Sequence, residues 1–477
     1  MHSSRSWYPL CFFSLSLLLI FIILPLTRQG MFMDGVIYAA IAKNLSLGYG
    51  SLWQPYYSQT DFPLFYEHPP LVFYFQSLFF RLFGQGFGVE QFYSFLMALG
   101  QFALISWYWL KNKNTSFLTL GLLLFLWLLT PLNHIYTSNM LESTLTLFTT
   151  FASLVLLANT KSKSAFFLQY LLSAIAILVA FFCNGPTAFF PLAVPLLNKL
   201  ILEQQALVKG IKETLFLITL VVLLLSGFYL LVPAALVNTQ KYFSQQLLAS
   251  ITGTRELNYV GLNHLHIVVL FYKPYRLVTV FALLSLAISA KIEGQSLVKK
   301  FKSSLQEKRA WFFFALALVS SLPVGISHRQ ALNYIMQSAP FFTLAMMYFC
   351  FESVKTIADY CKSKPWFFKT LTSLSCLIFV ACIAIVLNLA SGFNRHKAML
   401  EDLNYLINYC KNDEIISVSP ALYYKWYTGA YLARNSMISV TPQAGKALYL
   451  TLKTEPVPEN YHLIKLPLSY YHLARHD

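Results

Sequence analysis

Residues 27–84 read TRQGMFMDGVIYAAIAKNLSLGYGSLWQPYYSQTDFPLFYEHPPLVFYFQSLFFRLFG, and the interpretation of the whole chain depends on this stretch. It leaves an apolar segment and soon reaches an acid, Asp34. It then passes through glycine, tyrosine and tryptophan to EHPP at 67–70 and ends in the short apolar run 69–83. Because most of the other residues are apolar, we expect most of the protein's chemistry to lie here.

The composition of the 477-residue chain is that of a membrane protein. Hydrophobic residues make up 57% and charged residues 11%, with a mean hydropathy of +0.56, whereas soluble domains carry about a quarter charged residues. The seven cysteines form no CxxC pair, so neither a disulfide framework nor a zinc site is expected.

The formal net charge of +16 does not indicate a nucleic-acid partner. Lys and Arg fall mainly in short loops between apolar runs, where they orient a membrane protein. No basic stripe is interleaved with aromatic residues, as nucleic-acid binding would require.

Apolar runs predict eleven membrane-spanning helices. The first, 9–26, has one Arg in front and no cleavage pattern behind it, so we interpret it as a retained helix and not as a signal peptide. The run 69–83 has only about 15 residues, whereas a span needs roughly 20, and we expect it to lie in the membrane interface. The other ten spans are expected at 88–110, 116–132, 139–159, 165–183, 186–200, 213–236, 271–290, 310–326, 333–351 and 366–390.

The distribution of basic residues supports this count. The short loops 133–138 and 184–187 contain no Lys or Arg, and 326–332 contains only Arg329. By the positive-inside rule the N-terminus is then cytoplasmic, and the loops 27–87 and 237–270 and the C-terminus face outward. The basic residues on the opposite, inner side are Arg5, Lys111, Lys113, Lys161, Lys163, Lys199, Lys209, Lys212, the cluster 291–309, Lys355, Lys362 and Lys364.

The last segment, 391–477, is more polar and contains short β-like runs such as EIISVS and ALYLTLK between helical patterns. We interpret it as a small α/β domain outside the membrane. The predicted fold is thus an all-α polytopic integral membrane protein, with a transmembrane domain at 1–390 and this small C-terminal domain.

The predicted topology brings a restricted set of polar side chains to the outer face. Carboxylates at a lipid boundary are costly to keep ionised unless they are paired or used. Two of them on separate segments, Asp34 and Glu142, therefore indicate a site. The other polar candidates on this face are Glu67, His68, Asn184, His328, Arg329 and Tyr334.

Plainer interpretations of these residues stay open. Asp34 is also a favoured N-cap for the helix GVIYAAIAKNL. Glu142 is also compatible with a headgroup-facing acid at a helix start, where the dipole favours it. Arg329 is compatible with a nonspecific contact to lipid phosphate, and His68 with a solvated surface group.

Two motifs of the first loop resemble a known family. Asp34–Ala42 reads Asp-x-x-x-Tyr-Ala-x-x-Ala, and EHPPL at 67–71 and LFG at 82–84 follow it. This order resembles the first outer loop of glycosyltransferases of the GT-C fold, in the branch of the protein mannosyltransferases and lipid A aminoarabinose transferases (family 39-like).

Later motifs extend the resemblance to roughly residues 1–350. NMLE at 139–142 resembles a second-loop motif in which an acid opens the fourth span. CNGP at 183–186 resembles the family's Lys-Gly-Pro, and Arg329, Tyr334 and Pro340 resemble its Arg/Lys…Tyr…Pro segment.

Three positions depart from the family pattern. Gly35 stands where many members carry Glu, His68 stands where Lys precedes Pro-Pro, and Asn184 replaces the Lys of Lys-Gly-Pro. Two cations expected near the donor phosphate are thus missing or weakened, which indicates a different donor or compensation by other cations. The candidates for compensation are Arg329, Lys43 and Arg255.

The resemblance implies transfer of a sugar from a polyprenyl-phosphate carrier of the undecaprenyl type. An inverting displacement needs one base, and we expect Asp34 to be that base, with Glu142 orienting the acceptor or sharing the role. Cations such as Arg329 and a protonated His68 are expected to stabilise the leaving phosphate. The predicted substrate-binding and donor-binding residues are Tyr38, Glu67, His68, Asn184, Arg329 and Tyr334.

Other features of the expected site are less determined. Tyr38, Trp53, Tyr56 and Tyr66 either stack on sugar or belong to the aromatic belt at the membrane surface, and the belt is favoured. A groove beside 69–83 is expected to hold the lipid tail. A divalent metal on Asp34 and Glu142 is compatible with the preference of hard cations for carboxylates, although the sequence does not require one.

Rival functions are a flippase or transporter, and a polymerase or ligase, of lipid-linked glycans. Transporters often show internal repeats and charges near the membrane midplane, and neither is apparent here. The acceptor can be lipid A, another glycan or a protein. Short loops and the small outer domain favour a bacterial inner (plasma) membrane.

Overall fold

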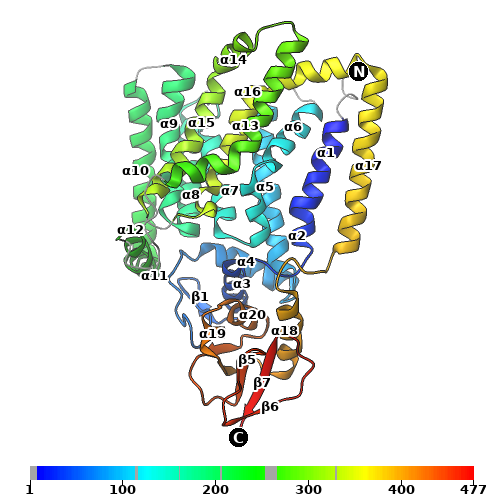
Figure 1. Ribbon diagram of the computed structural model, residues 1–477. Helices are drawn as coiled ribbons and strands as arrows, with labels where there is room; N and C mark the ends of the chain where they lie inside the picture. The colour runs from blue at the N-terminus through cyan, green and yellow to red at the C-terminus, as the bar shows by residue number, and fades with distance from the viewer. Residues whose placement is uncertain (1–7, 113–116, 161, 205–206, 253–265, 328–329) are drawn as a thin grey trace.

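The computed structural model describes residues 8–112, 117–160, 162–204, 207–252, 266–327 and 330–477. These residues form a bundle of helices with a small sheet domain attached at one end (Figure 1). We call that end of the bundle the domain end. The predicted class, a helical membrane protein with a small C-terminal α/β domain, is confirmed.

Seven helices among the described residues are long and apolar enough to cross a membrane, and the count rises to eight if α6 (Phe117–Leu128) and η2 (Pro131–Ser138), bent by 75°, are one span. The predicted total of eleven stays a prediction, because α7 (Leu141–Val155) has only 15 residues and α5 (Val89–Asn112) is less apolar. The seven helices are Tyr8–Leu26 (α1, η1 and α2), Lys163–Asn184 (α8), Leu207–Leu231 (α10), His266–Ile292 (α13), Lys308–Ile326 (α15 and η6), Leu332–Lys362 (η7 and α16) and Pro365–Leu389 (α17).

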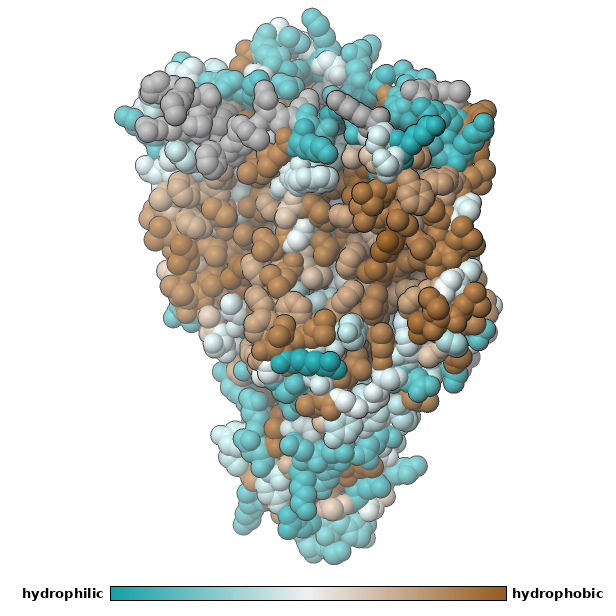
Figure 2. Space-filling model, turned by 180° about the vertical axis from the view of Figure 1, so that it is seen from behind, coloured by the Kyte–Doolittle hydropathy of each residue, from teal (hydrophilic) through white to brown (hydrophobic). Residues whose placement is uncertain are grey.

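The surface agrees with a chain that spans a membrane. On the face seen in Figure 2, a broad hydrophobic band crosses the middle of the bundle, and hydrophilic residues gather at both ends. The lysine-rich α14 (Leu297–Leu305) lies at the end opposite the C-terminal domain (Figure 1). The chain is therefore an integral membrane protein, and which end faces the cytoplasm stays a prediction.

Prolines break the helices near the domain end. Because proline lacks an N–H, it fits a helix start better than a helix interior. Pro131 opens η2 after α6, and Pro186 opens η3 (Pro186–Ala193) after Gly185, whose φ is +85°. Pro233 opens α11 (Pro233–Tyr242) after α10. The irregular segments that follow these breaks lie near the candidate site.

The first long loop contains two helices, α3 (Met33–Ser46) and α4 (Leu71–Phe83), with a small hairpin of β1 (Gly50–Ser51) and β2 (Gln54–Pro55) between them. The short helix predicted at 69–83 is therefore present, and Pro70 is its N-cap. It is amphipathic, since Val72, Phe73, Gln76, Ser77 and Phe80 are buried on one face.

The C-terminal domain holds a five-stranded sheet in the order β4-β3-β5-β7-β6. The first three strands are parallel, and β7 pairs antiparallel with β5 and β6. The core of this domain also contains Met31 and Val36 of the first loop. The elements of the domain are α18 (Lys397–Tyr409), β3 (Ile415–Val418), α19 (Pro420–Tyr423), α20 (Tyr427–Ser436), β4 (Ser439–Thr441), β5 (Leu448–Leu452), β6 (Tyr461–Leu463) and β7 (Tyr471–His476).

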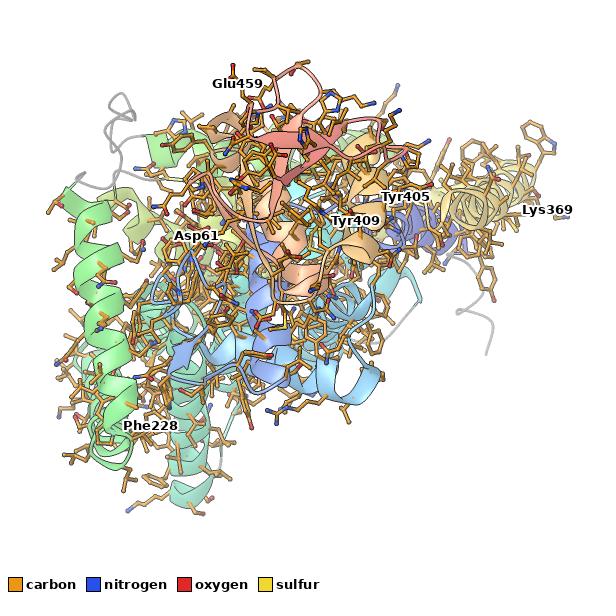
Figure 3. The ribbon with its side chains drawn as sticks, turned by 90° about the horizontal axis from the view of Figure 1, so that it is seen from below. Asp61, Phe228, Lys369, Tyr405, Tyr409 and Glu459 are labelled. Atoms are coloured by element: carbon orange, nitrogen blue, oxygen red, sulfur yellow. The ribbon has the colours of Figure 1, made fainter. Side chains whose placement is uncertain are left out.

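The remaining elements of the bundle are short or continue the long helices. They are α9 (Val194–Leu197), η4 (Asn198–Glu203), η5 (Phe243–Leu247) and α12 (Leu248–Thr252). Seen from the domain end, the C-terminal domain covers the middle of the bundle, while α17 with Lys369 projects at one edge (Figure 3).

Candidate active site

Asp34 lies in the first turn of α3, where the positive end of the helix dipole favours a carboxylate. The N-cap of α3 is Phe32, and no side chain makes a capping hydrogen bond there. The interpretation of Asp34 as the cap residue is therefore wrong. Its side chain shares a face of α3 with Tyr38, four residues further on.

Gly35 explains how α3 comes so close to the start of α7. A Cβ at this position would lie 1.9 Å from the carbonyl oxygen of Ser138, so a side chain cannot be placed here without a shift of the backbone. The Gly35 carbonyl accepts a 2.9 Å hydrogen bond from Asn139 Nδ2, and Asn139 also bonds to Gln76 of α4. The residue that departs from the family pattern thus serves close packing beside Asp34.

Glu142 lies in the first turn of α7 and is only 3% exposed. A buried carboxylate needs polar partners, and Asn333 Nδ2 donates to its Oε1 at 2.8 Å. A second amide, Asn184, interacts with the same carboxylate, and the charge of Asp34 lies near enough to act on it. The interpretation of Glu142 as a headgroup-facing acid is therefore wrong.

Tyr38 lies at the centre of this group. Its hydroxyl is hydrogen-bonded to His68 Nε2 at 3.1 Å, and the two rings meet edge to face. Burial is the main cause that raises the pKa of Tyr38 well above its usual range, and nearby acidic groups add to the shift. In decreasing order of effect, these groups are Asp34, Glu142, Tyr334 and Glu67.

The favoured placement of two tyrosines in an aromatic belt is wrong. Tyr38 is 6% exposed and Tyr66 is 7% exposed, whereas belt residues lie at the membrane surface. Tyr66 packs under the ammonium of Lys241, whose Nζ lies 4.7 Å from the ring centroid.

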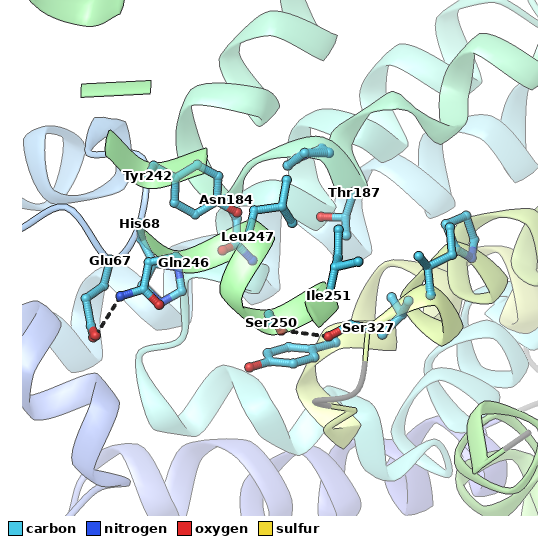
Figure 4. Close-up of a pocket in the computed structure, with 15 residues that line it drawn as sticks. Glu67, His68, Asn184, Thr187, Tyr242, Gln246, Leu247, Ser250, Ile251 and Ser327 are labelled. Atoms are coloured by element: carbon cyan, nitrogen blue, oxygen red, sulfur yellow. Dashed lines mark hydrogen bonds between the residues drawn. The ribbon is translucent and has the colours of Figure 1, made fainter. Parts of the chain in front are cut away.

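A cavity of about 300 Å³ is lined by His68, the hydrogen-bond partner of Tyr38 (Figure 4). Its polar side carries Glu67, His68, Asn184, Tyr242 and Gln246. Gln246 Nε2 donates to Glu67 Oε1 at 2.8 Å, which ties the first loop to the segment after α11. Gly185 makes room here, since a Cβ on it would lie 2.5 Å from the Tyr242 hydroxyl.

The other side of the cavity is mostly apolar. It is formed by Leu247 and Ile251 and by Pro323, Val324 and Ile326 of η6. The apolar surface expected beside 69–83 is thus supplied at this cavity by other segments, since no residue of α4 lines it. A cavity with one polar and one apolar side fits an amphiphile whose polar head lies near His68.

The structure brings seven of the eight predicted catalytic and binding residues into one neighbourhood. The eighth, Arg329, and the neighbouring candidate His328 lie outside the described residues. Lys43 is turned away, because its Nζ donates to the carbonyls of Arg434 and Asn435, and Arg255 also lies outside the described residues. The seven residues are Asp34, Tyr38, Glu67, His68, Glu142, Asn184 and Tyr334.

Sequence reasoning missed two amides that hold the acids in place, Asn333 and Gln246. Asn333 directly precedes the predicted Tyr334, and Gln246 lies in the predicted outward loop 237–270. Both amides therefore lie in or beside segments that the sequence assigns to the outer face. Nothing in the sequence, however, pairs either amide with a particular carboxylate.

Among the described residues, no group of three or more His, Cys, Asp or Glu side chains lies close enough to hold a metal ion. A divalent metal on Asp34 and Glu142 would have to take its other ligands from water, substrate or backbone oxygens. Such a metal stays a prediction from the sequence.

Comparison with known proteins gives a likeness of structure only. No protein-family model and no curated protein sequence matches the chain. Two crystal structures of ArnT from Cupriavidus metallidurans resemble it along almost the whole length at 12% sequence identity. The apo state covers 96% of both chains with a TM-score of 0.61, and the form bound to undecaprenyl phosphate covers 97% of both with a TM-score of 0.62.

A weaker likeness, with a TM-score of 0.45 and 9% identity, is found to the archaeal oligosaccharyltransferase AglB from Archaeoglobus fulgidus, over 92% of this chain and 69% of that one. The two ArnT structures share both the helical bundle and the C-terminal domain with this chain, since nearly all of each chain is matched. The chain therefore has the GT-C fold that its sequence motifs predict.

Proposed function

We propose that the protein is a membrane glycosyltransferase that moves a sugar from a polyprenyl-phosphate donor to an acceptor at the domain end of the bundle. One observation carries this proposal. Two carboxylates from separate segments, Asp34 and Glu142, converge on Tyr38 next to a cavity with a polar and an apolar side.

Asp34 is the base in this proposal. Asp34 is a partly exposed residue, and in this proposal an acceptor hydroxyl reaches its carboxylate and gives up its proton as the new glycosidic bond forms. Glu142 is buried and fixed by Asn333, which suits a group that orients the acceptor or supports the charge of Asp34. A single displacement that inverts the anomeric carbon needs only one base.

The cavity is the proposed place of the donor. Its apolar side fits the polyprenyl chain, and its hydroxyl and amide groups fit the sugar and phosphate. In this proposal His68, in its protonated form, stabilises the leaving phosphate. The fold shared with an ArnT structure bound to undecaprenyl phosphate supports this type of donor.

The cellular setting is part of the proposal. Basic residues gathered at the end that carries α14 support a cytoplasmic location for that end, with the site and the C-terminal domain outside. The setting we propose is a bacterial inner membrane, with a lipid, glycan or protein as acceptor.

The test is sugar transfer by purified protein, measured as acceptor-dependent release of undecaprenyl phosphate from a panel of undecaprenyl-phosphate sugars. Asp34→Asn is expected to lower the rate by about 100-fold or more, since general base catalysis contributes on that order. The matched control is Asp359→Asn, in the last turn of α16. The Asp359 carboxylate there accepts a hydrogen bond from Lys362 at 3.1 Å.

Full activity of Asp34→Asn would remove this residue as the base. If the wild-type protein moved intact lipid-linked sugars across a vesicle membrane without releasing the carrier, the flippase interpretation would replace the transferase.

A further inference from the structure

Helix α20 of the C-terminal domain packs along α3, the helix that carries Asp34. Met31 and Val36 are 7% and 2% exposed, and both belong to the core formed by α18, α20 and the sheet. In return, Ala433 of α20 belongs to the cluster around Tyr38. The two segments therefore share one apolar interface although they are far apart in the chain.

One hydroxyl group fixes the entry to α3 within this interface. The Tyr431 hydroxyl accepts a 2.9 Å hydrogen bond from the backbone N–H of Met31 and donates to the Met31 carbonyl at 3.5 Å. Met31 precedes Asp34 by three residues, and α3 begins between them at Met33. Tyr431 thus holds both backbone groups of a residue at the approach to the Asp34 turn.

Arg434, one turn further along α20, anchors the helix itself. Its guanidinium bonds to both carboxylate oxygens of Glu90 at 3.1 and 2.8 Å and to the carbonyls of Gln85 and Gly86 at 3.1 and 3.0 Å. The side chains of the ion pair are 4% and 6% exposed. The end of α20 is also bonded by Lys43 Nζ, at 2.9 and 2.7 Å from two of its carbonyl oxygens.

The segment before α3 is held from a second direction. Gln29 pairs with the linker after α17, donating to the Gly392 carbonyl at 2.8 Å and accepting from the Asn394 N–H at 2.7 Å. Gly30, with φ +88°, lets the Arg395 carbonyl approach, since a Cβ there would lie 2.6 Å from that oxygen. The linker thus fixes residues 29–30, and Tyr431 fixes the next residue.

We propose that Tyr431 of the C-terminal domain is a positioning residue for Asp34, and that the domain serves the reaction by setting the first turn of α3. This inference rests on the proposed function for its chemical meaning. Tyr431 acts through the backbone of Met31 and does not touch the substrate. The C-terminal domain is therefore a part of the active-site scaffold.

The test replaces only the hydroxyl group, with Tyr431→Phe in the full chain. The matched control is Tyr471→Phe, a buried tyrosine of the same domain whose hydroxyl bonds to the Thr428 hydroxyl at 2.7 Å and not to the backbone of Met31. Hydrogen–deuterium exchange of the peptide 27–40 is measured for both, together with kcat and the donor KM. The exchange measurement needs no substrate.

We expect Tyr431→Phe to accelerate exchange in 27–40 about fivefold, which corresponds to the loss of one net hydrogen bond, and Tyr471→Phe to leave it unchanged. We expect kcat to fall about tenfold, because small displacements of a catalytic group are costly, with the donor KM unchanged since Tyr431 does not line the cavity.

Unchanged exchange in 27–40, unchanged kcat, or an equal loss in both variants would overturn the inference. A fall in kcat accompanied by an equal rise in the donor KM would also overturn it, since that pattern indicates a disturbed cavity. If the wild-type protein transferred no sugar, the proposed function would fail, and the exchange data alone would decide whether Tyr431 holds the turn.

Discussion

The ion pair between Arg434 and Glu90 allows a quantitative test of how the C-terminal domain is held. Both side chains are almost fully buried, 4% and 6% exposed, and they meet at 2.8 Å. Arg434→Met removes the cation and leaves the Glu90 carboxylate buried without it. Breaking such a pair costs about 3 kcal/mol or more, because an uncompensated charge stays in a poorly solvated place.

The assay is native-state hydrogen exchange of the α20 peptide, 427–436, in detergent or lipid nanodiscs. A loss of about 3 kcal/mol corresponds to an increase of about 150-fold in the population of the open state of this segment. The matched control is Arg475→Met in the same domain, where the exposed guanidinium bonds to the Tyr409 hydroxyl at 3.0 Å. We expect that control to exchange like the wild-type protein.

The double variant Glu90→Leu with Arg434→Met separates the charge effect from the loss of packing. Replacing a whole buried pair by apolar residues is often nearly neutral, so we expect much of the protection to return. The carbonyls of Gln85 and Gly86 still lose their donor, which keeps the recovery incomplete. Exchange of the single variant within threefold of wild type, or a double variant as open as the single one, would refute the reasoning.

Three further outcomes are expected. Gly35→Ala should lower the melting temperature and abolish transfer, because its Cβ would lie 1.9 Å from a backbone carbonyl, whereas Gly227→Ala, with open space around it, should do neither. Asn333→Leu should lower kcat by about 10-fold or more, since it removes a hydrogen bond to the Glu142 carboxylate; unchanged kinetics would show that the bond is dispensable. Burial lowers the pKa of Lys43 from 10.5 to about 8. Between pH 8 and pH 10.5 the unfolded chain therefore binds more protons than the folded chain, and the free energy of unfolding increases as pH rises, by up to about 3 kcal/mol. Melting curves of Lys43→Met should lack this increase, and an equal pH dependence of the melting temperature in both proteins would contradict the prediction.

Local patterns in the sequence predict the bundle well. The runs at 165–183 and 271–290 lie within α8 and α13, and the run 366–390 extends one residue beyond the end of α17. An apolar stretch of membrane length has few alternatives to a helix. Its length and charge context distinguish the run 69–83 from these spans, and residues 71–83 of it form the short helix α4. The number of spans is less determined, since short or partly polar helices such as α7 satisfy the hydropathy pattern only in part.

The candidate site was predictable in its membership and not in its contacts. Asp34 and Glu142 stand out because acids are rare in an apolar chain. The predicted topology places both of them on the same face of the membrane. Asn333 and Gln246 are ordinary amides in sequence, and their pairing with carboxylates arises from the irregular segments near prolines. The attachment of Met31 to Tyr431 joins residues 400 positions apart, for which a single sequence carries no local signal.

That separation has a consequence for how the protein is made. Met31 leaves the ribosome early, but its hydrogen-bond partner follows 400 residues later. At about 5–20 residues per second, the first loop therefore waits roughly 20–80 s before Tyr431 is available. During this time the bundle inserts while the turn that carries Asp34 lacks its contact with Tyr431. The protein completes the surroundings of its proposed base as one of the last events of biogenesis, so a chain interrupted before α20 is an inserted membrane protein without a finished candidate site.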